Sequence, residues 1–160
     1  ILGMCVMCME NQEPKPRLCL YARKSGESDE RQSLSIDSQI SEMQKIVARD
    51  QLEVTVILRE SCSAKKCGQR EVFKRMLDLI TSGEIAGIVT WSADRLSRNA
   101  GDLGLLVDLM DEGKLKIIVT YSQTFTDNPN QKFLLMILVS QAKLENDKRS
   151  LSIRRGKRNQ

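Results

Sequence analysis

The chain has 160 residues and a formal net charge of +4, and its 41% hydrophobic and 29% charged residues suit one globular domain and exclude wholesale disorder. No apolar run approaches the roughly 18 residues that a bilayer-spanning helix needs. The absence of histidine excludes Ser-His-Asp and Cys-His catalysis and histidine-ligated metals, so an enzyme here would depend on Ser, Asp, Glu, Arg, Lys, Cys or Tyr.

Residues 1–16 are predicted to be a poorly ordered or extraneous lead. They lack the basic region and cleavage site of a signal peptide, so we expect a cytoplasmic protein whose five cysteines are reduced. Cys5 and Cys8 form a C-x-x-C pair, and Cys62 and Cys67 a C-x4-C pair. These pairs would make a zinc site only if they met, and without a clear loop framework around both we expect no metal.

From residue 17 onward, apolar residues either alternate in short runs or recur every three to four positions, which predicts strands and amphipathic helices. The predicted strands cover residues 18–22, 54–58, 85–91 and 117–121, and the predicted helices cover 36–47, 72–80, 103–110 and a long stretch within 129–160. Strands that alternate with helices indicate a parallel sheet covered on both faces. We therefore expect a three-layer α/β/α domain over residues 17–128, with a mostly parallel sheet of four or five strands, followed by a long C-terminal helix.

The last predicted helix changes character along its length. It is apolar from Leu134 to Leu144 and basic after Lys148. Residues 143–160 contain seven basic and two acidic side chains, a net +5, so residues 1–142 carry about −1. A neutral body with a basic end indicates a polyanionic partner, most simply nucleic acid, and a solvated helix face is the alternative. The candidate DNA contacts are Lys148, Arg149, Arg154, Arg155, Lys157 and Arg158.

We expect catalytic or ligand-binding residues just after the strands, because parallel sheets bind ligands at the carboxyl ends of their strands. The first predicted strand ends in YARKS and the third in WSADRLSRN. If these strands are neighbours, they bring together Ser25, Arg23, Asp94, Arg95 and Arg98. Guanidinium groups around a hydroxyl suit a phosphate and favour a serine nucleophile without histidine. The alternative is an ordinary loop serine beside a helix N-cap and a surface salt bridge.

Read together and in order, these blocks resemble the catalytic domain of serine site-specific recombinases, the resolvase and invertase superfamily. The resemblance runs over nearly the whole chain, from residue 17 to 156, and is most like the large serine integrases and transposon recombinases. Its segments are YARKS at 21–25, SLSIDSQ at 33–39, ESCSAKKCGQR at 60–70, DRLSRN at 94–99, and the helix start at 134–145.

By similarity, Ser25 attacks a DNA phosphodiester and forms a covalent 5′-phosphoserine link with a free 3′-hydroxyl, without metal, ATP or cofactor. Asp94 would assist proton transfer at the leaving oxygen or position an arginine. The side chains that would bind the scissile phosphate and its transition state are Arg23, Arg95 and Arg98, with Arg70 and Gln39 completing the pocket.

The resemblance also implies partners. DNA would lie along the basic end of the last helix, and the apolar half would pair copies of the chain into dimers or tetramers. The family continues into a separate DNA-binding domain that we expect to be absent from this chain. Two other functions stay open, namely a catalytically silent DNA-binding or oligomerisation module and a phosphate-binding α/β module of the same fold.

Overall fold

The structure is a computed structural model that describes residues 13–24, 34–61, 70–97 and 99–158. Strands and helices alternate along most of the chain, as the sequence predicts. In chain order, the elements are β1 (Arg17–Arg23), α1 (Ile36–Arg49), β2 (Glu53–Glu60), α2 (Glu71–Thr81), β3 (Gly87–Thr90), α3 (Ala93–Leu96), α4 (Ala100–Asp111), β4 (Ile117–Val119), β5 (Thr124–Thr126) and α5 (Pro129–Arg158).

The strands form one sheet in the order β2-β1-β3-β4-β5. The pairs β1–β2, β1–β3 and β3–β4 are parallel, and β5 runs antiparallel to β4. The predicted α/β fold, with a mostly parallel sheet and a long C-terminal helix, is confirmed. The sequence did not predict β5 or α3, because elements of three and four residues are too short to show a period.

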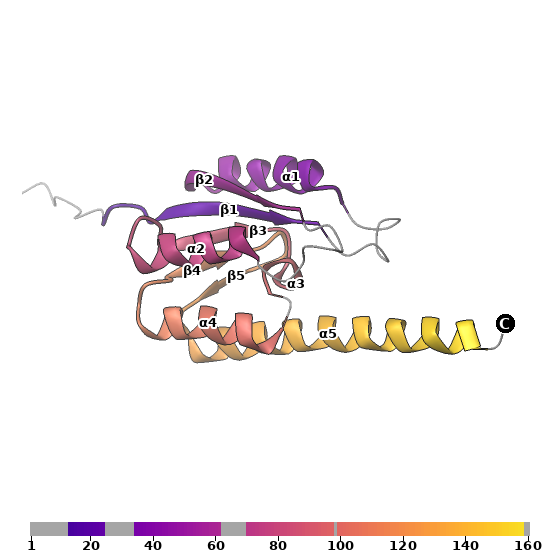
Figure 1. Cartoon of the computed structure of the whole chain (residues 1–160). Helices are drawn as coiled ribbons and strands as arrows, with labels where there is room; N and C mark the ends of the chain where they lie inside the picture. The colour runs from indigo at the N-terminus through magenta and orange to yellow at the C-terminus, as the bar shows by residue number, and fades with distance from the viewer. Residues whose placement is uncertain (1–12, 25–33, 62–69, 98, 159–160) are drawn as a thin grey trace, which may run out of the picture.

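Helices cover both faces of the sheet, and α1 lies on the opposite side from α2, α4 and α5 (Figure 1). On the first face, Met43 of α1 belongs to a buried cluster with Leu20 and Val89. On the other face, Met76 of α2 and Leu106 of α4 belong to the larger core cluster. All four residues of β3 are buried, which is typical of a central parallel strand with helices on both sides.

Close packing at the centre of the sheet depends on Gly87. It pairs with Leu18 of β1 on one side and with Ile117 of β4 on the other. A Cβ atom at this position would collide with both neighbouring side chains and would lie 2.9 Å from the backbone oxygen of Ile117. The glycine therefore allows a spacing between strands that no side chain permits.

Helix α5 is 30 residues long, so its axis measures about 45 Å. Its first half packs against α3, α4 and β5, with Leu135 and Val139 buried in the core, and its second half extends away from the sheet (Figure 1). Near its start, Lys132 forms ion pairs with Asp111 and Asp127. None of the helices in the described ranges combines the length and hydropathy that crossing a bilayer requires.

Candidate active site

Arg23, the last residue of β1, links the carboxyl end of this strand to α3. Its Nε donates to the carbonyl oxygen of Arg95 at 2.9 Å, and its Nη2 donates to that of Asp94 at 2.7 Å. The residue is only 7% exposed. Because β3 lies beside β1 and runs in the same direction, the short α3 that follows β3 comes within reach of the Arg23 side chain.

Gln39 in the first turns of α1 contacts the same strand end. Its Nε2 donates to the carbonyl oxygen of Arg23 at 3.1 Å and to that of Leu34 at 2.9 Å. The side chain is almost completely buried, and its Oε1 accepts no hydrogen bond from the described residues. Gln39 therefore ties the end of β1 to the start of α1.

Arg70 enters the cluster from the residue that precedes α2. Its Nη1 bonds to the Asp102 carboxylate, and its Nη2 donates to the Tyr21 hydroxyl at 3.1 Å and to the carbonyl oxygen of Leu96 at 3.3 Å. The guanidinium carbon also lies 4.0 Å from the ring centroid of Phe73, a cation–π distance. Arg23 and Arg70 thus bind three successive carbonyl groups of α3, although they come from distant segments of the chain.

The Tyr21 hydroxyl and the Glu60 carboxylate form a buried pair beside Arg70. Burial raises the pKa of Tyr21, and the hydrogen bond to Glu60 raises it further. The phenol therefore stays protonated at neutral pH, which suits a hydrogen-bonding role and not that of a base. Arg70 Nη2 also lies 3.5 Å from the Glu60 carboxylate, so this arginine faces two carboxylates.

Asp94 and Arg95 are residues of α3 whose side chains lie close to each other. The Asp94 carboxylate accepts a hydrogen bond from the Ser92 hydroxyl and lies 3.8 Å from Nε of Arg95. The Arg95 side chain is 11% exposed, and its Nε makes no hydrogen bond to the described residues.

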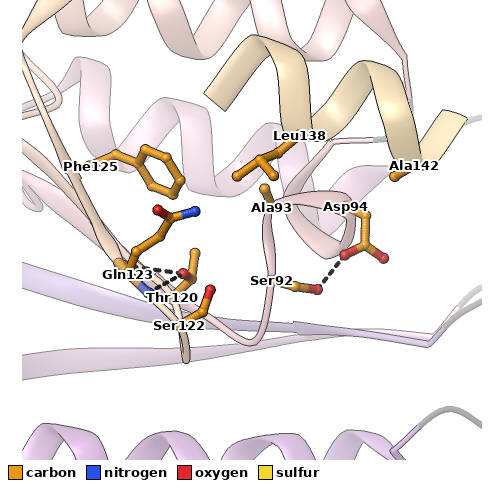
Figure 2. Close-up of a pocket in the computed structure, with 9 residues that line it drawn as sticks. All are labelled: Ser92, Ala93, Asp94, Thr120, Ser122, Gln123, Phe125, Leu138 and Ala142. Carbon is orange, nitrogen blue, oxygen red and sulfur yellow. Dashed lines mark hydrogen bonds between the residues drawn. The ribbon is translucent and has the colours of Figure 1, made fainter. Parts of the chain in front are cut away.

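Asp94 also borders a cavity of about 170 Å³ between α3, the β4–β5 turn and α5 (Figure 2). Hydroxyl and amide groups line much of this cavity, and the Ser92 and Asp94 side chains lie on its α3 side. The remaining lining residues include Thr120, Ser122, Gln123, Phe125 and Leu138.

Comparison with known families identifies the chain. A family model described as the N-terminal domain of resolvase matches residues 18–160. The chain belongs to the resolvase family. The serine recombinase catalytic domain that the sequence predicted is thereby confirmed at the level of the family.

Solved structures with the same fold include three recombinase domains. The N-terminal catalytic domain of TP901-1 integrase has a TM-score of 0.59 and 20% identity, covering 82% of this chain and 97% of that one. A resolvase family site-specific recombinase from Streptococcus pneumoniae has a TM-score of 0.61 and 21% identity, covering 89% and 95%. The C-terminal catalytic domain of ISC1926 TnpA, an IS607-like serine recombinase, has a TM-score of 0.51 and 19% identity, covering 65% and 69%. No curated protein sequence matches the chain.

The resolvase-family domain brings most of the predicted catalytic residues into one connected cluster. Ser25 and Arg98 lie outside the described residues. Arg23 and Arg70, predicted to bind phosphate, have protein partners in this conformation. The predicted residues that the cluster contains are Arg23, Gln39, Arg70, Asp94 and Arg95.

Three members of the cluster were not predicted: Tyr21, Glu60 and Asp102. Tyr21 and Glu60 are the first residues of two motif segments, YARKS and ESCSAKKCGQR. The resemblance implied roles for other residues of these segments but none for the first. Asp102 lies in the first turn of α4, where an acidic residue is ordinarily explained by the helix dipole.

The other predicted sites lie apart from this cluster. Exposed on the second half of α5 are Lys148, Arg149, Arg154, Arg155 and Lys157, while the Arg158 side chain lies outside the described part of the chain. The cysteines of the two spaced pairs, Cys5, Cys8, Cys62 and Cys67, also lie outside it. Among the described residues, no group of three or more metal-ligating side chains comes together.

Proposed function

We propose that this resolvase-family domain cleaves and rejoins DNA through a covalent link to Ser25. The observation that carries the proposal is the convergence of Arg23 and Arg70 on α3. It lies at the strand end that Gln39 binds and from which the chain continues two residues to Ser25. A serine beside several fixed guanidinium groups is the arrangement that phosphoryl transfer needs when histidine is absent.

In the proposed reaction, Ser25 Oγ forms a bond to phosphorus, and the bond from phosphorus to the 3′-oxygen breaks. The serine loses its proton, and the 3′-oxygen gains one, with Asp94 either assisting this transfer or positioning Arg95. The new phosphoserine ester conserves the energy of the broken ester, so rejoining by the reverse step requires no ATP. The arginines supply positive charge that a metal ion supplies in other phosphoryl transfers.

Arg95 is the described arginine best suited to contact the scissile phosphate. Its side chain is largely buried, and its Nε has no hydrogen-bond partner among the described residues. A buried donor without a partner is costly, so binding a phosphate oxygen would remove that cost. Arg98, three residues later, is proposed to complete this contact.

We further propose that α5 binds DNA along its basic second half. The charged residues from Lys148 to Lys157 extend beyond the sheet, where no helix or strand of the described ranges lies against α5 (Figure 1). Contacts of lysine and arginine with phosphates carry little sequence information, so the affinity of this surface is expected to be weak and salt-sensitive.

The first half of α5 is proposed to pair two copies of the chain. The face opposite the buried Leu135 and Val139 exposes a shallow groove, and Phe133 alone is 64% exposed. Burying such apolar side chains favours association. The groove is lined by Phe133, Met136, Ile137, Ser140, Gln141 and Leu144.

A catalytically silent binding module is the second candidate, and one observation favours it. In this conformation, Arg23 is bonded to backbone carbonyls and Arg70 to carboxylates, so neither guanidinium requires a phosphate. Such a module would bind DNA reversibly and form no covalent product.

A denaturing gel separates these two functions. The chain is incubated with a randomised library of nicked duplexes, so that cleaved ends diffuse away and covalent complexes accumulate. We expect protein attached to 5′ ends with the wild-type chain, none with Ser25→Ala, and normal amounts with Ser41→Ala, a control on the exposed face of α1. The proposal is wrong if the wild-type chain gives no adduct, or if Ser25→Ala still gives one.

A further inference from the structure

We propose that Asp102 is a positioning residue for this reaction, because its carboxylate holds the Arg70 guanidinium against α3. The inference rests on the proposed function and extends it to a residue outside the motif segments. In this proposal Asp102 acts through Arg70, which contacts both β1 and α3.

The backbone around Arg70 does little to fix its side chain. Arg70 precedes α2 with φ 36° and ψ 50°, the left-handed conformation that residues with a side chain rarely adopt. Its side chain makes no capping hydrogen bond to α2. The position of the guanidinium is therefore decided by the Phe73 ring of α2, over which it lies, and by hydrogen bonds to other segments.

Of its hydrogen bonds to described residues, the one with Asp102 joins opposite charges, whereas the Tyr21 hydroxyl and the Leu96 carbonyl are neutral partners. The second carboxylate, Glu60, lies farther away, at 3.5 Å from Nη2. The side chains of Arg70 and Asp102 are only 10% and 16% exposed, so solvent screens their attraction weakly.

Asp102 is itself held firmly. The Asn99 side chain caps α4 and accepts a hydrogen bond from the backbone N–H of Asp102 at 2.8 Å. This cap fixes the first turn of α4, the backbone from which the carboxylate projects. The same turn begins directly after the DRLSRN segment. Arg70 therefore contacts α4 through the Asp102 carboxylate and α3 through the Leu96 carbonyl.

Glu60 determines what happens when Asp102 is removed. Its carboxylate lies 3.5 Å from Nη2 of Arg70 and is already bonded to the Tyr21 hydroxyl. Without Asp102, Glu60 is the carboxylate that remains beside the guanidinium among the described residues. We expect Arg70 to turn toward it and away from the Leu96 carbonyl, which loosens α3 where Asp94 and Arg95 lie.

The test is the single-turnover rate of 5′-adduct formation on a nicked duplex recovered from the library that the wild-type chain cleaves. Asp102→Asn keeps the shape but removes the charge, and we expect a rate about 10- to 100-fold lower, the loss of one charge-assisted hydrogen bond. DNA affinity should change little, because Asp102 lies away from the basic half of α5. Asp108→Asn, an exposed carboxylate on the same helix, is the matched control and should react like the wild-type chain.

A double-mutant cycle separates positioning from a merely structural role. In an Arg70→Ala background, Asp102→Asn should slow the reaction by less than about threefold, because the group it positions is gone. Asp102→Glu should recover part of the rate, and it replaces Asp102→Asn in the cycle if that variant does not fold by circular dichroism.

Three results would overturn the inference: equal rates for Asp102→Asn and Asp108→Asn, a faster rate for Asp102→Asn, or an undiminished effect in the Arg70→Ala background. If the wild-type chain itself formed no adduct, that result would instead contradict the proposed function.

Discussion

Replacing Arg23 by lysine tests whether its guanidinium holds α3 against the end of β1. The planar guanidinium donates two hydrogen bonds, one from Nε to the carbonyl of Arg95 and one from Nη2 to that of Asp94. A lysine ammonium cannot donate to both carbonyls in the same geometry. Losing one charge-assisted hydrogen bond lowers the free energy of unfolding by about 1.5–3 kcal/mol. For a domain of this size, about 2–4 °C of melting temperature corresponds to 1 kcal/mol, so we expect a decrease of about 3–12 °C.

The assay is thermal unfolding followed by circular dichroism, with Arg17→Lys as the matched control. Arg17 is exposed at the opposite end of the same strand, so that its replacement should change the melting temperature by about 2 °C or less. Equal melting temperatures for the two variants would refute the argument that Arg23 anchors α3. Because α3 carries Asp94 and Arg95, Arg23→Lys should also slow adduct formation.

Four further predictions follow from other parts of the molecule. Gly87→Ala should lower the free energy of unfolding by about 1–3 kcal/mol in urea titrations, because Cβ has no space there, whereas Gly104→Ala, with open space around Cβ in α4, should not. Ile137→Asp should weaken self-association by about tenfold or more in analytical ultracentrifugation, and an unchanged dissociation constant would contradict pairing through α5. The double variant Arg154→Ala and Arg155→Ala should reduce the slope of log K against log salt by about 2 if both side chains contact phosphates. Burial raises the pKa of Cys19 to about 12, so this thiol should stay protonated and resist iodoacetamide at pH 8 until the chain unfolds; labelling of the folded chain at Cys19 would contradict this.

The elements that the sequence predicted are those with enough residues to show a period. Helices α1 and α2 have 14 and 11 residues with strongly one-sided apolar faces, and both were expected near their observed bounds. By contrast, β5 and α3 have three and four residues, so their existence depends on pairing with β4 and on the contacts of α3 with Arg23 and Arg70.

From the sequence alone follow the parallel sheet, the edge at which its strands end, and the residue types gathered there, because alternation and motif order are local properties of the chain. Only the tertiary structure decided which partner each of those side chains has. The Arg23 bonds to the α3 carbonyls span 71 and 72 residues, and the Arg70 bond to Asp102 spans 32. No spacing rule encodes contacts of that range, since they arise only when β3 and the helices after it dock beside β1.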